Sequence, residues 1–466
     1  MTTEGCARRR FAAALLGVLG AAATAAEGDR DPYASTYVAP EAPPYLLEGA
    51  TVLTGTGERL DDTDVLFADG EIVAIGQGLD PPRDAVVVDG SGRWVTPGII
   101  DVHSHLGDYP APGVDAHSDG NEATAPVTAR VWAEHSVWPQ DPQFPLALAG
   151  GITTLQVLPG SANLIGGRGV TLRNVPGRSV MDMKFPGAPH SLKMACGENP
   201  KRVYGNRRQA PSTRMGNVAG YRESWIRAAE YRDDWDAYAA AVADGDEEAE
   251  APTRDLELET LAGVLRGEIL VHNHCYRADE MLVMLEIARE FDYRITAFHH
   301  ATEAYKIGDV LAEEGVCAAM WADWWGFKLE AFDAVGANVP MVDAQGACAI
   351  VHSDSARDIQ RLNQEAAKAM GSARRMGLEV DEATAIRWIT SNAAAALGLG
   401  DRTGQLTPGY LADVVLWDGN PFSIYTRAEK VWIDGALRFD ATDPDSRWTT
   451  DFELDQTPAG RGEAGR

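Results

Sequence analysis

The chain has 466 residues, and its composition of 45% hydrophobic and 24% charged residues is that of an ordinary globular protein with a sizeable core. The formal net charge of −28 at pH 7 argues against binding to nucleic acid or to an anionic membrane surface, because both select basic patches. The length suits one large α/β barrel with a smaller domain.

Residues 1–26 have the layout of an export signal. Arg8, Arg9 and Arg10 precede the apolar run 11–26, which ends in small residues typical of a cleavage site. The run is short for a membrane helix, which needs about 20 apolar residues. Because the arginines are followed by Phe11, they also resemble a twin-arginine signal, and the plain secretory and twin-arginine routes stay open alike. We expect an exported, periplasmic or secreted protein.

Short strand patterns occur near both ends of the chain. After a linker at 27–44, a hairpin is predicted around Asp69-Gly70, because apolar, β-branched runs flank this turn pair. Strand patterns return at 412–417 and 430–435. We therefore predict a composite β-sandwich domain built from residues 45–97 and 404–440, followed by a C-terminal tail at 441–466.

Residues 98–403 alternate apolar strands with helical patterns, which is typical of βαβ units and a parallel sheet. The predicted fold class is therefore α/β, with a (β/α)₈ TIM-like barrel joined to the small β-sandwich domain. A charged stretch predicts a helical insertion at about 200–260. The clearest patterns predict strands at 269–271, 295–298 and 349–351, and helices at 278–291, 304–314, 359–376 and 381–397.

Two of the ten histidines, His103 and His105, end the apolar segment 97–105. Residues i and i+2 of a strand point to the same face, so this pair could chelate one metal ion. Taken alone, the pair fits hydrogen-bonded, partly buried histidines more often than a metal site. However, other metal-competent residues also follow apolar strands, and the active site of a βα barrel lies at the C-terminal strand ends.

Segment 97–105, Pro-Gly-Ile-Ile-Asp-Val-His-Ser-His, resembles the first barrel strand of the amidohydrolase superfamily. Residues 150–157 are similar to its second strand, 390–398 to its closing helix and 404–413 to its return to the β-domain. The nearest members are of the imidazolonepropionase and Xaa-Pro dipeptidase types. The resemblance covers roughly residues 45–440 and implies a metal-dependent hydrolase of C–N bonds in an amide, peptide or cyclic amide.

The resemblance also implies further metal ligands. Strand five should end in a histidine, for which His274 is preferred over His272, a core or supporting residue. Strand six offers the adjacent pair His299 and His300, whose side chains should face opposite ways, and His300 is preferred. Strand eight supplies Asp354.

The strand-four ligand is open between two residues. Family members often use a carboxylated lysine or a glutamate to bridge two metals; Lys193 matches the first and Glu198 the second, and Glu198 is preferred. A site holding one metal without either ligand is the third option. His352 is expected to be a structural neighbour of Asp354.

Imidazole and carboxylate ligands suit Zn²⁺, one or two ions, with Mn²⁺, Fe²⁺ and Ni²⁺ as alternatives. The resemblance implies that the metal activates water, that Asp354 is the general acid/base, and that His274 or His300 polarises the substrate carbonyl if one ion binds. Tyr276 and Arg277 are expected to bind substrate at the rim, although Arg277 could instead pair with an acid on the next helix.

The expected substrate is a small molecule or short peptide. Lactone hydrolysis or ring deamination at the same site, and a non-catalytic role, are the alternative functions. A homo-oligomer is also compatible with the sequence.

Two residue groups have no assigned role. Four cysteines lie outside the signal, at positions 196, 275, 317 and 348, and the absence of any Cys-x-x-Cys pair predicts free, buried thiols. Four aromatic residues, at 321, 324, 325 and 327, follow strand seven. They either wall the pocket or belong to the core, which is the commoner place for aromatic clusters.

Overall fold

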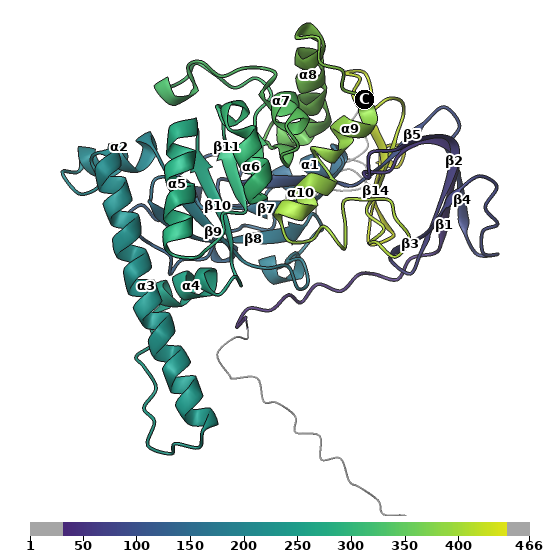
Figure 1. Cartoon of the computed structure of the whole chain (residues 1–466). Helices are drawn as coiled ribbons and strands as arrows, with labels where there is room; N and C mark the ends of the chain where they lie inside the picture. The colour runs from purple at the N-terminus through teal and green to yellow at the C-terminus, as the bar shows by residue number, and fades with distance from the viewer. Residues whose placement is uncertain (1–30, 445–466) are drawn as a thin grey trace, which may run out of the picture. The chain divides into compact units, whose positions relative to one another are not determined.

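The computed structural model describes residues 31–444, so the predicted export signal at 1–26 lies outside the described residues. The chain divides into two units after Tyr33, and all elements named below belong to the second, Ala34–Arg466. Two eight-stranded sheets and a set of helices make up this unit (Figure 1). Among the described helices, none has the length and apolar character needed to cross a membrane.

One sheet has the strand order β13-β12-β11-β10-β9-β8-β7-β6 and forms a nearly closed barrel. Neighbouring strands are parallel except for β8, which runs antiparallel to both β7 and β9. A β-hairpin therefore replaces one βα unit, but the predicted TIM-like barrel is confirmed. The strands are β6 (Ile99–Ser104), β7 (Ile152–Val157), β8 (Ile165–Arg173), β9 (Ser191–Ala195), β10 (Leu270–Cys275), β11 (Ala297–His300), β12 (Cys317–Met320) and β13 (Ala349–Val351).

The first and last barrel strands are joined through the segment between two short helices. The backbone N–H of Ile100 donates to the carbonyl of Ile389 at 2.9 Å, and that of Val351 donates to the carbonyl of Trp388 at 3.0 Å. At the C-terminal ends of these strands, the N–H of Asp354 donates to the carbonyl of His103 at 3.0 Å. This contact brings the strand-one and strand-eight residues of the predicted site together.

Helices cover the barrel strands. The predicted helix at 381–397 is two helices. Thr390, between them, has the non-helical angles φ −135° and ψ −92°. The carbonyls of Trp388 and Ile389 accept hydrogen bonds from barrel strands instead of from the next helical turn. The helices are α1 (Gln143–Ala149), α5 (Ala278–Glu290), α6 (Gly308–Glu314), α7 (Asn338–Ala344), α8 (Leu362–Arg375), α9 (Glu382–Arg387) and α10 (Ser391–Ala396). Short 3₁₀ turns lie at Asp115–His117, Ala133–His135, Val180–Asp182, Ala304–Lys306, Leu329–Ala331 and Ile359–Arg361.

Between β9 and β10 the chain forms α2 (Glu198–Asn206), α3 (Arg214–Ala243) and α4 (Leu256–Leu265). The hydroxyl of Thr213 accepts from the N–H of Gly216 and caps the start of α3. Tyr221 and Trp225, in the first half of α3, are buried, whereas its last turns are mostly exposed. Figure 1 shows the C-terminal half of α3 extending away from the barrel strands.

The second sheet combines strands from both ends of the chain, which confirms the predicted composite β-domain. Its order is β16-β15-β14-β5-β1-β2-β3, with β4 pairing β1. Asp69 (φ 51°) and Gly70 (φ 83°) form the predicted β2–β3 hairpin turn, in which positive φ at both positions is favoured. The strands are β1 (Tyr45–Leu53), β2 (Arg59–Ala68), β3 (Glu71–Gly76), β4 (Val86–Asp89), β5 (Trp94–Pro97), β14 (Val414–Trp417), β15 (Ala428–Ile433) and β16 (Ala436–Asp440).

A buried ion cluster connects the barrel to the β-domain. Arg173, at the end of β8, is 1% exposed and donates to Asp413 at 2.5 Å and to Asp434. The hydroxyl of Thr403 also donates to Asp413, at 2.6 Å. One cation thus pairs with two buried carboxylates at the junction.

The four cysteines are paired, so the prediction of free thiols is wrong. One disulfide joins Cys196, directly after β9, to Cys275 at the end of β10, and the other joins Cys317 in β12 to Cys348 before β13. Neighbouring parallel strands bring each pair side by side, with Cα–Cα distances of 5.2 and 4.4 Å. Sequence spacing concealed these pairs, because the partners are 79 and 31 positions apart.

Candidate metal centre

His103, His105 and Asp354 meet at the C-terminal end of β6. The nearer carboxylate oxygen of Asp354 lies 3.2 Å from His105 Nε2 and 3.5 Å from His103 Nε2. Their three ligand atoms all lie within 4.8 Å of one another. The ring nitrogen Nδ1 of His105 lies 2.8 Å from the carbonyl of Leu158, so Nδ1 is the donor and Nε2 has its lone pair free.

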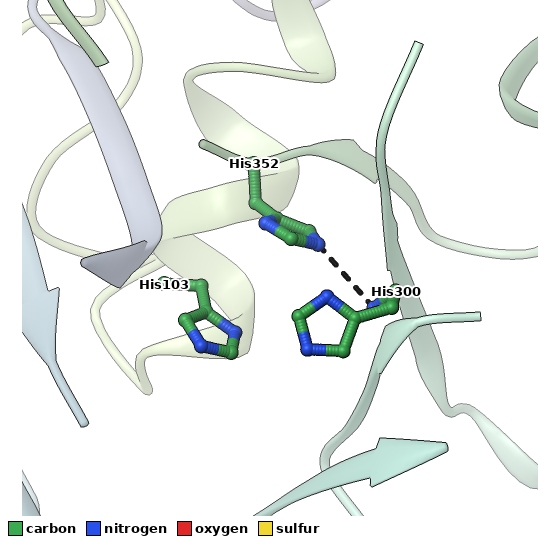
Figure 2. Close-up of side chains that lie close together, drawn as sticks. All are labelled: His103, His300 and His352. Atoms are coloured by element: carbon green, nitrogen blue, oxygen red, sulfur yellow. Dashed lines mark hydrogen bonds between the residues drawn. The ribbon is translucent and has the colours of Figure 1, made fainter. Parts of the chain in front are cut away.

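A second group is formed by His103, His300 and His352, whose ligand atoms also lie within 4.8 Å of one another. Figure 2 shows these rings grouped together, with the backbone N–H of His300 donating to Nε2 of His352 at 3.3 Å. His300 Nδ1 is 3.8 Å from Asp354, which links the two groups. Sequence reasoning treated His352 only as a neighbour of Asp354; the structure places it among the candidate ligands.

The adjacent histidines His299 and His300 both contact His103, although alternation in a strand predicts opposite directions. The ring centroids of His299 and His300 lie 4.8 and 4.9 Å from that of His103. The reason is local backbone geometry: β11 ends at His300, which has φ 71°, so the extended conformation behind the alternation rule is lost there. Positive φ at a non-glycine residue is uncommon and clusters at functional sites.

Beyond the candidate ligands, a chain of imidazoles continues into the barrel. Nδ1 of His299 lies 2.9 Å from Nδ1 of His103, and Nε2 of His299 lies 2.8 Å from Nδ1 of His272. His272 therefore lies behind the candidate ligands and contacts His299, in the supporting position that was one of its two predicted roles. The supporting contact of His299 was not predicted, and only the adjacent-histidine pattern at 299–300 hinted at it.

The two strand-four candidates occupy different places. Lys193 is buried in β9, with Nζ 3.2 Å from Nε2 of His103, and burial lowers its pKa to about 8. Glu198 instead begins α2, after Gly197 turns the chain with φ 74°, and its carboxylate lies 3.7 Å from Arg202. Glu198 lines a hollow of about 670 Å³ between α2 and the start of α3. The geometry therefore favours Lys193 over the residue preferred from sequence.

His274, in β10, lies beside His300, with ring centroids 4.5 Å apart. Its Nε2 is 3.3 Å from the side-chain amide of Asn199. Tyr276 follows and stacks on His300 at 5.2 Å, whereas Arg277 donates to Asp279 at 3.1 Å and is partly exposed. Tyr276 therefore contacts the candidate centre. Arg277 pairs with an acidic residue of the next helix, which was the alternative to its expected substrate-binding role.

The electrostatics suit a divalent cation. Burial lowers the pKa of His352 to about 3, so this imidazole is neutral at pH 7. Burial would raise the pKa of Asp354, but its contact with His105 and the positive charge nearby outweigh that effect and leave this pKa below its ordinary value. Burial also lowers the pKa of His103, His272, His274, His299 and His300.

Neutral imidazoles and an ionised carboxylate are the donors that Zn²⁺ prefers. The buried Nδ1 atom of His300 has no hydrogen-bond partner among the described residues. Buried polar atoms are nearly always satisfied, and a metal ion would satisfy this one. The residues therefore fit a metal ion.

Asp101 connects the two strands that carry the centre. Its carboxylate accepts from the hydroxyl of Ser353 at 2.5 Å and from the backbone N–H of His103 and Ser353, both at 3.2 Å. Because Ser353 precedes Asp354, Asp101 positions the aspartate relative to His103.

Comparisons with known proteins relate the chain to amidohydrolases. A family model described as "Amidohydrolase family" matches residues 309–439. The chain is 35% identical to the crystal structure of an amidohydrolase from Thermotoga maritima MSB8, with a TM-score of 0.78, over 85% of this chain and all of that one. An adenosine deaminase from Xanthomonas campestris shares the fold, with a TM-score of 0.50 at 16% identity over 89% of this chain and 97% of that one.

Among curated proteins, the chain is 35% identical over 397 residues to the amidohydrolase tasK of Hapsidospora irregularis. This match covers 81% of the chain but spans only 40% of the length of that relative. The similarity to the Thermotoga protein extends over the whole length of that protein. The chain belongs to the amidohydrolase superfamily.

Proposed function

We propose that the protein is a metal-dependent hydrolase that cleaves a C–N bond in an amide, peptide or cyclic amide. The observation that carries this proposal is the meeting of His103, His105 and Asp354 within 4.8 Å at the end of β6. These residues come from opposite ends of the barrel sequence, and two imidazoles with one carboxylate at a partly buried site form a ligand set for a divalent cation.

His103, His105 and Asp354 would hold one ion, most suitably Zn²⁺. His274, His300 and Lys193 would hold a second, with Lys193 carboxylated by CO₂, as its family resemblance implies. A low pKa at a buried lysine favours the neutral amine that such a reaction requires. When bound, the metal supplies a Lewis acid that makes water more acidic and polarises a carbonyl.

The chain's own residues then handle the proton and the substrate. Asp354 accepts a proton from the attacking water and returns it to the leaving nitrogen, a role that needs a carboxylate ionised at neutral pH. Asp101 and Ser353 keep that carboxylate oriented. If one ion binds, a protonated nitrogen of His300 can donate to the carbonyl oxygen. Tyr276, which stacks on His300, forms part of the wall beside the reacting bond.

The test combines metal analysis with a library of dipeptides, N-acyl amino acids and cyclic amides. We expect stoichiometric metal and turnover of at least one amide, with Asp354→Asn reducing kcat by a factor of about 100 or more while the protein stays folded. Tyr425→Ala, in the loop between β14 and β15, is the control variant. Wild-type turnover in metal-loaded Asp354→Asn would contradict the role of the aspartate.

The same metal-replete protein distinguishes the alternatives. Lactones and aminopurines added to the library report lactone hydrolysis and deamination at the same site. Turnover of those compounds with none of any amide would replace the C–N hydrolase proposal, and no metal and no turnover would leave a non-catalytic member of the superfamily.

We further propose that the protein is exported. The signal-like pattern at 1–26 supports this, and so do the two disulfides, because disulfides persist in oxidising compartments and are rare in the cytosol. The test is cell fractionation of the full-length protein. Retention in the cytosol after Arg8→Lys and Arg9→Lys would indicate the twin-arginine route, and a cytosolic wild type would contradict export.

A further inference from the structure

We propose that the segment 321–332, after β12, forms a subsite for an aromatic or large apolar group of the substrate. The proposal rests on the hydrolase function above and specifies its substrate class. Its basis is a continuous series of aromatic rings that begins on a candidate metal ligand and ends at exposed side chains.

The inner rings are fixed to the metal centre. Trp321 is 8% exposed and stacks on His300, with ring centroids 4.3 Å apart and an interplanar angle of 27°. Its indole N–H donates to the carbonyl of Ser353 at 3.3 Å. Trp324 stacks in turn on Trp321, at 5.0 Å and 25°. Any group held against these rings therefore lies close to the residues proposed for the reaction.

The outer rings are more than half exposed. Trp325 and Phe327 are 52% and 57% exposed, and together with Asp323 and Trp324 they line a hollow of about 430 Å³. Leaving apolar surface in water costs roughly 25 cal/mol per Å², and clustered exposed apolar groups mark binding sites. The volume falls within the range of about 300–1,000 Å³ that is usual for small-molecule sites.

A partly buried lysine holds this segment in place. Lys328 Nζ lies 3.9 Å from the ring centre of Tyr276, donates to Asn199 at 3.2 Å and pairs with Glu330 at 3.2 Å. The adjacent Phe327 packs edge-on against Tyr276 and Trp321, with centroids 6.5 and 5.8 Å away. A surface fixed in this way loses little entropy when a ligand binds.

The charges around the subsite select the type of group. The cation of Lys328 is balanced by Glu330, and the carboxylate of Asp323 on the rim is paired with Lys368 at 3.0 Å. The hollow therefore offers aromatic faces without an unpaired charge. The matching substrates are dipeptides or N-acyl amino acids with a phenylalanine, tyrosine or tryptophan side chain.

The first experiment measures selectivity. The kcat/KM of the metal-loaded enzyme is compared for matched N-acyl substrates that differ only in phenylalanine or alanine. We expect a preference of about 10-fold or more for phenylalanine, equivalent to about 1.4 kcal/mol. Phe327→Ala and Trp325→Ala should reduce this preference to about 3-fold or less. Tyr425→Ala, an 86% exposed aromatic in the β-domain, is the matched control.

The second experiment needs no catalysis. Binding of N-acetyl-4-fluoro-L-phenylalaninamide to the metal-free protein is followed by ¹⁹F NMR. We expect binding that Phe327→Ala weakens by about 10-fold and Tyr425→Ala leaves unchanged. Equal binding by wild type and Phe327→Ala, or equal selectivity, overturns the subsite. Absence of turnover with intact probe binding would instead count against the hydrolase function, so the two failures are distinguishable.

Discussion

His299 lies 2.9 Å from His103, Nδ1 to Nδ1, inside the barrel. If Nε2 of His103 binds a metal, its Nδ1 carries the proton and donates to Nδ1 of His299, so Nε2 of His299 must donate to Nδ1 of His272 at 2.8 Å. The contact therefore fixes one tautomer for each of three neutral rings.

We expect His299→Leu to weaken metal binding by about 10–100-fold, because it removes the acceptor that orients His103. His299→Asn, whose amide oxygen can occupy the position of Nδ1, should retain most of the affinity. Competition with a chromogenic chelator measures both variants. Wild-type affinity in His299→Leu would show that the imidazole chain does not position the ligand.

Lys193 and Glu198 make opposite predictions for metal content. We expect Lys193→Ala to lose the second ion and most activity, because its Nζ lies beside His103. Glu198→Ala should keep its metal, because its carboxylate pairs with Arg202. Elemental analysis of both proteins, prepared with and without bicarbonate, tests this directly. Metal loss in Glu198→Ala alone would restore Glu198 as the strand-four ligand.

Replacing Arg173 with methionine should destabilise the protein by about 3–5 kcal/mol at pH 7, because Asp413 and Asp434 would remain buried without their cation. Burial already raises the pKa of Asp434, and Arg173 opposes that rise. Without Arg173 the pKa of Asp434 in the folded state increases further above its value in the unfolded state. The variant therefore loses stability as the pH rises through this folded-state pKa. We therefore expect the difference in Tm from wild type to shrink between pH 7 and pH 5, measured by calorimetry. A difference that is independent of pH would contradict this account.

Removing either disulfide should lower stability by about 2–5 kcal/mol. The Cys196–Cys275 bridge spans 79 positions and the Cys317–Cys348 bridge spans 31. In the chain-entropy model the longer loop contributes about 0.8 kcal/mol more. We expect the double variant Cys196→Ala/Cys275→Ala to unfold at lower denaturant than Cys317→Ala/Cys348→Ala. Free thiols in the oxidised wild type, counted by mass spectrometry after alkylation, would exclude the bridges.

The element pattern was readable because it depends on neighbouring residues. Alternating and continuous apolar runs predicted the barrel strands at 269–271, 295–298 and 349–351, and Asp69-Gly70 predicted its hairpin. Failures occurred where tertiary contacts override local preference: the single helix expected at 381–397 is broken because its carbonyls bond barrel strands.

The sequence by itself placed His103, His105 and Asp354 at strand ends and indicated the amidohydrolase superfamily, since these features reside in short, contiguous motifs. Only the tertiary structure decided that Lys193 rather than Glu198 approaches His103, that His299 contacts it as well, and that the cysteines pair. Each of these depends on which residues of neighbouring strands share a register and on where the backbone leaves the extended conformation, and these are properties of the closed barrel rather than of any local segment.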